Sequence, residues 1–109
     1  MTISAIHGNG YVSVTGFDGS DWNYSTALGV STPMKVDGVK LIPSASNQKV
    51  IIKADQGKTT NPIVGCCFAS ADSEPRVDSN FGQPFIPIID GTLSSSLNAT
   101  SVVVIYGKV

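Results

Sequence analysis

Several short segments of the chain alternate apolar and polar residues with a period of two. In Tyr11-Val12-Ser13-Val14-Thr15 the two valines fall on one face, and the stretch from Gly16 to Gly19 then interrupts the pattern. This is the pattern of a strand with one face in a core. Further strands are predicted at the apolar runs Lys49 to Ala54, Pro62 to Ala69, Phe85 to Ile89 and Ser101 to Gly107.

The segment around Asp37-Gly38 is β structure with two possible forms. Residues 34–36 and 39–42 flank a dipeptide that favours a two-residue hairpin turn. That hairpin would place Lys35 opposite Lys40, at a small electrostatic cost, so a bulge or a continuous strand stays open as the alternative. Residues 20–33 fit either an irregular strand or one helical turn. A polar loop is expected at residues 72–76.

The apolar composition settles the fold class. The chain has 22 Val and Ile against four Leu, and a single Glu beside 22 Ser and Thr. Since β-branched side chains favour sheets and Leu and Glu favour helices, the protein is predicted to be all-β. We expect a single-domain antiparallel β-sandwich over residues 11–109, jelly-roll-like rather than immunoglobulin-like because no Cys-Trp-Cys framework is present. Residues 1–10, with glycines at positions 8 and 10, are expected to form a flexible N-terminal arm.

The low charge of the chain limits the kinds of molecule that it is expected to bind. Only 14% of the residues are charged, against about 25% in an ordinary domain, and the formal net charge is −1. No basic stripe offers binding to nucleic acid, and no apolar span is long enough to cross a membrane. The N-terminus shows no export signal, so synthesis in a cytoplasm is expected. Such a surface costs little to desolvate and suits lasting protein contact.

Candidate chemistry is sparse. His7 is the one histidine, and no Gly-x-Ser-x-Gly segment presents a nucleophile, so no catalytic residue is predicted. The carboxylates of Asp18 and Asp21 could hold calcium, but Asx-turn bonding explains them better. Cys66 and Cys67 are expected to be two buried thiols on opposite faces of a strand. No metal and no cofactor are predicted.

The aromatic residues allow two interpretations. Trp22, Tyr24, Tyr11 and Phe17 could form a platform on which a sugar or a nucleobase stacks. Core packing is the commoner fate of such rings in a domain of this size.

The last predicted strand is apolar on both faces. Val102, Val104 and Tyr106 point one way, and Val103 and Ile105 point the other way. Either the strand lies centrally between two layers, or another subunit covers one of its faces.

The second half of the chain resembles accessory structural proteins of tailed-phage virions, particularly capsid cement or decoration proteins. The residues that carry the resemblance are Asn61-Pro62-Ile63-Val64-Gly65, the stretch from Gly82 to Gly91, and Ser101 to Gly107. The resemblance implies a protein on the capsid surface of a virion, made in the host cytoplasm, that binds the assembled major capsid protein, often as a homotrimer. The candidate subunit contact is then Val102, Val103, Val104, Ile105 and Tyr106. The candidate capsid contact is the N-terminal arm, through Thr2, Ile3, Ile6 and His7.

A different function class also fits the sequence. A carbohydrate- or receptor-binding module, fibre or lectin-like, would use Trp22 and Tyr24 beside Asp18 and Asp21.

Overall fold

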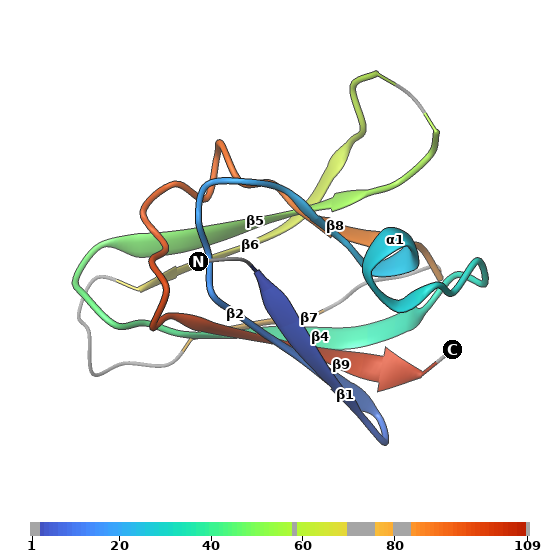
Figure 1. The fold of residues 1–109 in the computed structure, drawn as a ribbon, viewed down its shortest axis with the longest axis horizontal. Coiled ribbons are helices and arrows are strands. Elements are labelled where there is room, and N and C mark those ends of the chain that lie inside the picture. The colour runs from blue at the N-terminus through green and yellow to red at the C-terminus, as the bar shows by residue number, and fades with distance from the viewer. Residues whose placement is uncertain (1–2, 58, 70–75, 80–83, 109) are drawn as a thin grey trace.

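A computed structural model describes residues 3–57, 59–69, 76–79 and 84–108. These residues contain nine strands and one short helix (Figure 1). The elements are β1 Ser4–Gly8, β2 Tyr11–Thr15, β3 Trp22–Asn23, α1 Tyr24–Leu28, β4 Lys35–Ile42, β5 Gln48–Ala54, β6 Ile63–Ala69, β7 Arg76–Ser79, β8 Pro87–Ile89 and β9 Val102–Lys108. The all-β prediction is confirmed. Within the described part of the chain, no helix is long and apolar enough to cross a membrane.

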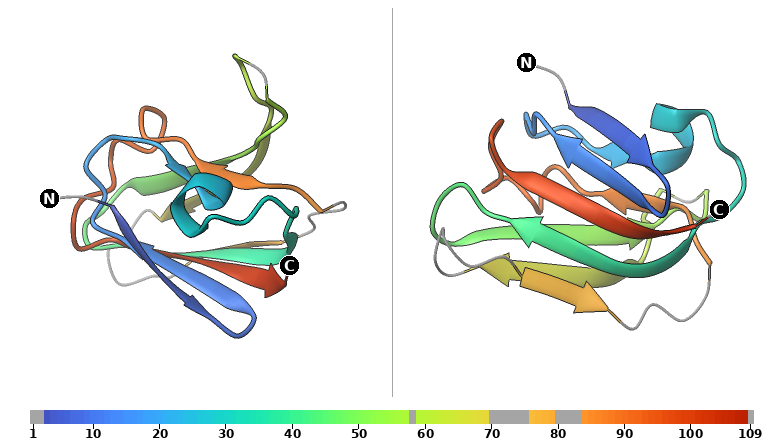
Figure 2. Two further views of the ribbon diagram at one scale, coloured as in Figure 1. Left: turned by 45° about the vertical axis from the view of Figure 1, so that its right-hand side comes forward. Right: turned by 90° about the horizontal axis from the view of Figure 1, so that it is seen from below.

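The strands form two antiparallel sheets. The five-stranded sheet has the order β1-β2-β9-β4-β7, and the four-stranded sheet has the order β3-β8-β5-β6. Figure 2 shows the five-stranded sheet in the foreground of its right-hand view, with β1 at the outer edge and β9 between β2 and β4. Each sheet therefore joins strands that are distant in the sequence.

Alternation along the strands places a shared core between the two sheets. Val12 and Val14 of β2 and Val103 and Ile105 of β9 are fully buried from one sheet, and Val50 and Ile52 of β5 from the other. The same cluster contains Phe17, Trp22, Tyr24, Met34, Val36, Val39, Leu41, Cys67, Ala69, Ile89 and Leu97. Burying such side chains is worth roughly 1.5–3 kcal/mol each, which makes this cluster the main stabilising feature.

The Asp37-Gly38 segment is one continuous strand with a bulge, not a hairpin. The register of β4 against β9 shifts between Val36 and Gly38. The extra residue lets Val36 and Val39 both face the core although they are three positions apart. The Lys35–Lys40 clash of the hairpin form is thereby avoided, so the bulged alternative is confirmed.

Residues 20–33, for which the sequence allows either an irregular strand or a helical turn, contain both a short strand and a short helix. Strand β3 pairs with β8, and α1 follows it directly. Asn23 caps the helix, because its Oδ1 accepts from the N–H groups of Ser25 and Thr26 at 2.9 and 3.3 Å. Gly29, at φ 67°, ends it in the left-handed conformation. Of the polar loop expected at residues 72–76, Arg76 begins β7 and the rest lies outside the described residues.

Candidate functional site

The outer side of the five-stranded sheet carries an exposed apolar surface that includes part of the predicted subunit contact. We call Ile6, Tyr11, Val102, Val104 and Tyr106 the outer face. Tyr11 lies opposite Tyr106 in the β2–β9 register, and both rings remain more than a third exposed. A shallow groove of about 360 Å³ runs between Tyr11, Ser13, Val104 and Tyr106. On β4, Ile42 lies opposite Val102 and extends the apolar surface.

One of the two apolar faces of strand β9 lies in the core, and the other does not. It lies centrally in its sheet, and Val103 and Ile105 are fully buried in the core. These two residues cannot contact another subunit, so the candidate contact reduces to Val102, Val104 and Tyr106. The first two are half-buried and the third is exposed. Whether a subunit covers this side stays a prediction.

The expected N-terminal arm is instead a strand from Ser4 onward. Ser4 to Gly8 pairs without a break with Thr15 to Tyr11, and residues 9 and 10 form the turn between the two strands, with Gly10 at φ 85°. Ile3 packs against the core, whereas Ile6 is 69% exposed on the outer face. His7 is exposed on the other side of β1. Thr2 lies outside the described residues.

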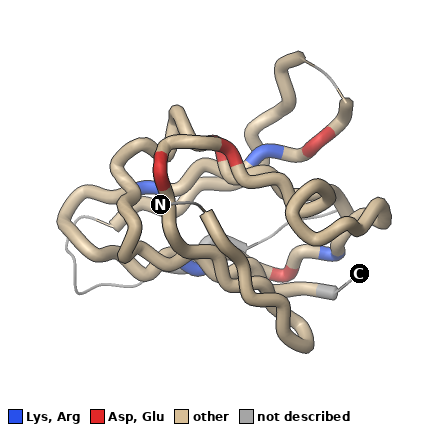
Figure 3. The backbone as a smooth tube through the Cα atoms, viewed as in Figure 1, with Lys and Arg blue, Asp and Glu red and all other residues tan. Residues whose placement is uncertain are grey.

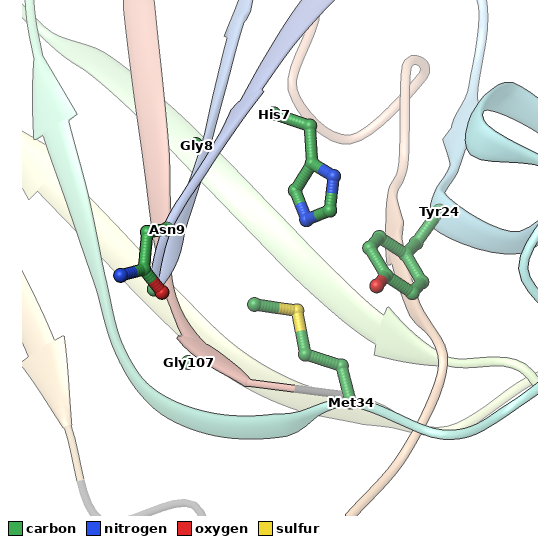
Figure 4. A pocket seen from close by; sticks show the side chains of 7 residues that line it. His7, Gly8, Asn9, Tyr24, Met34 and Gly107 are labelled. Atoms are coloured by element: carbon green, nitrogen blue, oxygen red, sulfur yellow. The ribbon is translucent and has the colours of Figure 1, made fainter.

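A cavity of about 390 Å³ lies under the β1–β2 turn. It is lined by His7, Gly8, Asn9, Gly10, Tyr24, Met34 and Gly107. In Figure 4 the His7 and Tyr24 rings point toward each other, and the Met34 side chain lies below them. The sequence pattern does not predict that these residues meet, because they come from β1 and the turn after it, from α1, from the chain before β4 and from β9.

The Tyr24 hydroxyl is the unusual group of this cavity. It is buried and is the one buried side-chain polar atom of the described residues that has no hydrogen-bond partner. Burial also raises the pKa of Tyr24 above its ordinary value, so the hydroxyl stays protonated. Imidazole, carboxamide and phenol groups can bind a small neutral molecule. The lining contains no carboxylate that could orient His7 as a general base.

The aromatic platform is not at the surface. Trp22, Tyr24 and Phe17 are 4%, 0% and 7% exposed, and Trp22 and Tyr24 meet edge to face with centroids 6.3 Å apart. Core packing is therefore confirmed for these three rings. Tyr11 alone of the four lies on the surface.

The two acidic residues before β3 accept hydrogen bonds, Asp18 within its own turn and Asp21 from a distant segment. Asp18 Oδ1 accepts from both the hydroxyl and the N–H of Ser20, and these two bonds lower the pKa of Asp18. Asp21 Oδ1 accepts from Gly91 N–H at 2.7 Å. The Asx-turn interpretation is confirmed for Asp18. In the described ranges no group of three or more His, Cys, Asp or Glu residues could hold a metal ion.

The adjacent cysteines differ in burial. Cys67 is buried and its thiol donates to Val39 O at 3.3 Å, whereas Cys66 is exposed. The expectation of opposite faces is confirmed, and the expectation that both thiols are buried is wrong for Cys66. Cys66 therefore lies on the outer side of the four-stranded sheet, where its side chain is exposed.

Comparison of the chain with protein-family models, with curated proteins and with solved structures finds no match. The function is therefore inferred from the geometry of the molecule.

Proposed function

We propose that this protein is a non-enzymatic structural protein of a virion, of the capsid cement or decoration type. It binds the assembled major capsid protein lattice and stabilises it. The observation that carries the proposal is the outer face, on which Tyr11, Val104 and Tyr106 form a broad apolar surface. Lys40 lies beside this face, opposite Val104 in the register of β4 and β9. A ligand that engages only the assembled state stabilises that state by mass action.

We further propose a jelly-roll sandwich for the fold. Without β1, strands β2 to β9 form two sheets in the orders β2-β9-β4-β7 and β3-β8-β5-β6. Two interlocked Greek keys produce this interleaving, and jelly rolls of eight strands are common in viral capsid and lectin domains. The strand order thus supports the architecture predicted from the sequence.

In this proposal the protein is a homotrimer on the capsid surface. In the trimer the copies contact one another through Val102, Val104 and Tyr106, the three residues of the predicted contact that lie outside the core, and capsid binding depends on this trimer. Aromatic residues on an uncharged surface are typical of the centre of protein interfaces. The sugar-binding alternative would need the rings of Trp22 and Tyr24 at the surface, and both are buried.

The experiment compares particles assembled with and without the protein. Tyr106→Asp places a charge on the outer face. Leu93→Asp is the matched control, because Leu93 is 39% exposed and Tyr106 is 40% exposed. We expect wild type and Leu93→Asp to copurify with capsids and to raise the temperature at which the particles release DNA. We expect Tyr106→Asp to bind at least tenfold more weakly, as a loss of about 1.4 kcal/mol would produce. Particles of equal stability with and without the protein would refute the proposal.

A further inference from the structure

Strand β1 is an unprotected sheet edge. It forms one end of the five-stranded sheet, and in the described structure no strand lies on its outer side (Figure 2). Proteins protect such edges with charges, prolines or bulges, because open backbone groups invite pairing with another strand. The sequence Ser-Ala-Ile-His-Gly has none of these, and its register with β2 is unbroken. Residues 1–17 contain no Asp, Glu, Lys or Arg, so the β1–β2 hairpin carries neither charge colour in Figure 3.

One hydrogen bond establishes the direction of the backbone groups in β2. Gly107 N–H donates to Gly10 O at 2.9 Å, so Gly107 directs its backbone groups toward the β2 side of β9. Residues in an antiparallel pair alternate between hydrogen-bonded and non-hydrogen-bonded positions. Ile105, two residues before Gly107, therefore bonds toward β2, where its partner is Val12. It follows that Tyr11 and every second residue after it bond toward β1.

The same alternation applies to β1. Its register pairs Ser4, Ile6 and Gly8 with the β2 residues that bond toward β1. The N–H and C=O groups of Ala5 and His7 consequently point away from the sheet. These are the backbone groups that a further strand would bind.

We propose that β1 pairs antiparallel with β1 of a second copy of this chain, about a two-fold axis at Ile6. In this register each Ala5 lies opposite His7 of the second copy, and the two residues exchange both of their N–H···O bonds. Ile6 lies opposite Ile6 in the non-hydrogen-bonded position, where side chains approach most closely. The two five-stranded sheets then form one continuous sheet across the axis.

The second copy is the occupant that the residues favour. Ile6 is the most exposed large apolar side chain of the described residues, and it is also the middle residue of β1. A two-fold axis at this position buries the side chain against its own copy and sets no like charges opposite each other. The contact is also closed, since the same strand is used by both copies. A charged partner strand would find no complementary charge on β1.

The pairing is expected to be weak in dilute solution. Two five-residue strands bury less than the roughly 1,000 Å² typical of stable interfaces. A high local concentration compensates for weak pairing, as neighbouring copies on one lattice would provide. This last consequence rests on the proposed function, whereas the pairing itself does not require a capsid.

Site-specific crosslinking tests the register with the purified protein. Ile6→Cys, in a Cys66→Ser background, places two sulfurs across the proposed axis, at a Cα separation of about 4.5 Å that a disulfide can span. Ser4→Cys is the matched control, because Ser4 is also exposed on β1 but lies opposite Gly8 of the second copy. We expect mild oxidation to convert Ile6→Cys to a covalent dimer at least tenfold faster than Ser4→Cys.

A backbone variant tests the edge itself. Ala5→Pro removes an outward N–H and keeps the bonds from β1 to β2, so it is expected to abolish the crosslinking of Ile6→Cys. If Ala5→Pro does not fold, as circular dichroism would show, Ile6→Lys takes its place in sedimentation of concentrated protein and is expected to remove the association seen for wild type. Equal crosslinking of Ile6→Cys and Ser4→Cys would overturn the proposal. The proposal would also be overturned if Ile6→Cys did not crosslink at all and Ala5→Pro lost capsid binding. That result would assign the β1 edge to a strand of the capsid protein.

Discussion

Lys53 Nζ lies 2.7 Å from Asp90 Oδ2, and this ion pair joins β5 to the turn that follows β8. The other oxygen of the same carboxylate accepts from Leu93 N–H at 2.7 Å. Burial alone would raise the pKa of Asp90. The bonds from Leu93 and Lys53 outweigh burial, so the pKa lies below its ordinary value.

Asp90 therefore makes stability depend on pH. A carboxyl whose pKa is lower in the folded state stabilises the protein above its unfolded pKa of about 3.9, and this contribution is lost as the pH falls through the folded pKa. We expect Asp90→Asn to lower the free energy of unfolding at neutral pH by about 1–3 kcal/mol and to flatten its decline in acid. Urea unfolding from about pH 7 to about pH 3 measures both effects. Asp37→Asn removes an exposed carboxylate and is the control for the loss of one negative charge alone.

The buried hydroxyl of Tyr24 gives a prediction of opposite sign. Because it has no partner, its removal costs no hydrogen bond and relieves a desolvated polar group. Tyr24→Phe is expected to be as stable as wild type or more stable by about 1 kcal/mol in thermal unfolding. A destabilised variant would show that a molecule in the cavity bonds to the hydroxyl. Tyr11→Phe, at an exposed ring, is the control.

Gly107 permits close contact between β9 and β4. A Cβ at this position would stand 2.0 Å from Lys35 O, and its φ is 155°. Gly107→Ala is expected to destabilise the protein by more than about 2 kcal/mol, since the strands would have to separate at the bulge. Gly57→Ala separates this steric effect from backbone strain, because Gly57 also has a positive φ, 70°, but has open space around it. It should cost only about 1–2 kcal/mol.

Gln48 connects the loop after β4 to the segment before β9. Its Oε1 accepts from Ser44 N–H and from the Ser101 hydroxyl, and its Nε2 donates to Ser96 O. Gln48→Leu keeps the volume and leaves these buried groups without partners, so we expect a loss of about 2–3 kcal/mol. Faster exchange of the Ser44 amide hydrogen would locate the effect. Unchanged exchange and stability would show that water replaces the side chain.

Much of the architecture could be predicted because it depends on local alternation. The strands β2, β5, β6 and β9 begin and end within two residues of their predicted limits, since each contains a short run of β-branched and other apolar residues. The bulge at Val36 could be anticipated from the unfavourable opposition of two lysines. These are signals that neighbouring residues carry.

The remainder depends on contacts between distant segments. The hydroxyls of Ser94 and Ser96 accept from the backbone N–H groups of Ile51 and Lys49, in place of a neighbouring strand. A serine triplet gives no sign of this in the sequence. The arm predicted at residues 1–10 was wrong from Ser4 onward, because its glycines make a turn rather than a hinge. The cavity beside Tyr24 depends on four separate segments of the chain and could not be foreseen.

The central place of β9 has a consequence for how the molecule acquires its shape. The strands on either side of it, β2 and β4, are made much earlier, yet they cannot join until Val102 to Lys108 has emerged from the ribosome. Until then the sheet that carries the core residues Val12, Val14, Val39 and Leu41 is incomplete. Closure of the five-stranded sheet thus waits for the last of its strands, and a variant without Val102 to Lys108 would leave β2 and β4 with no strand to join them.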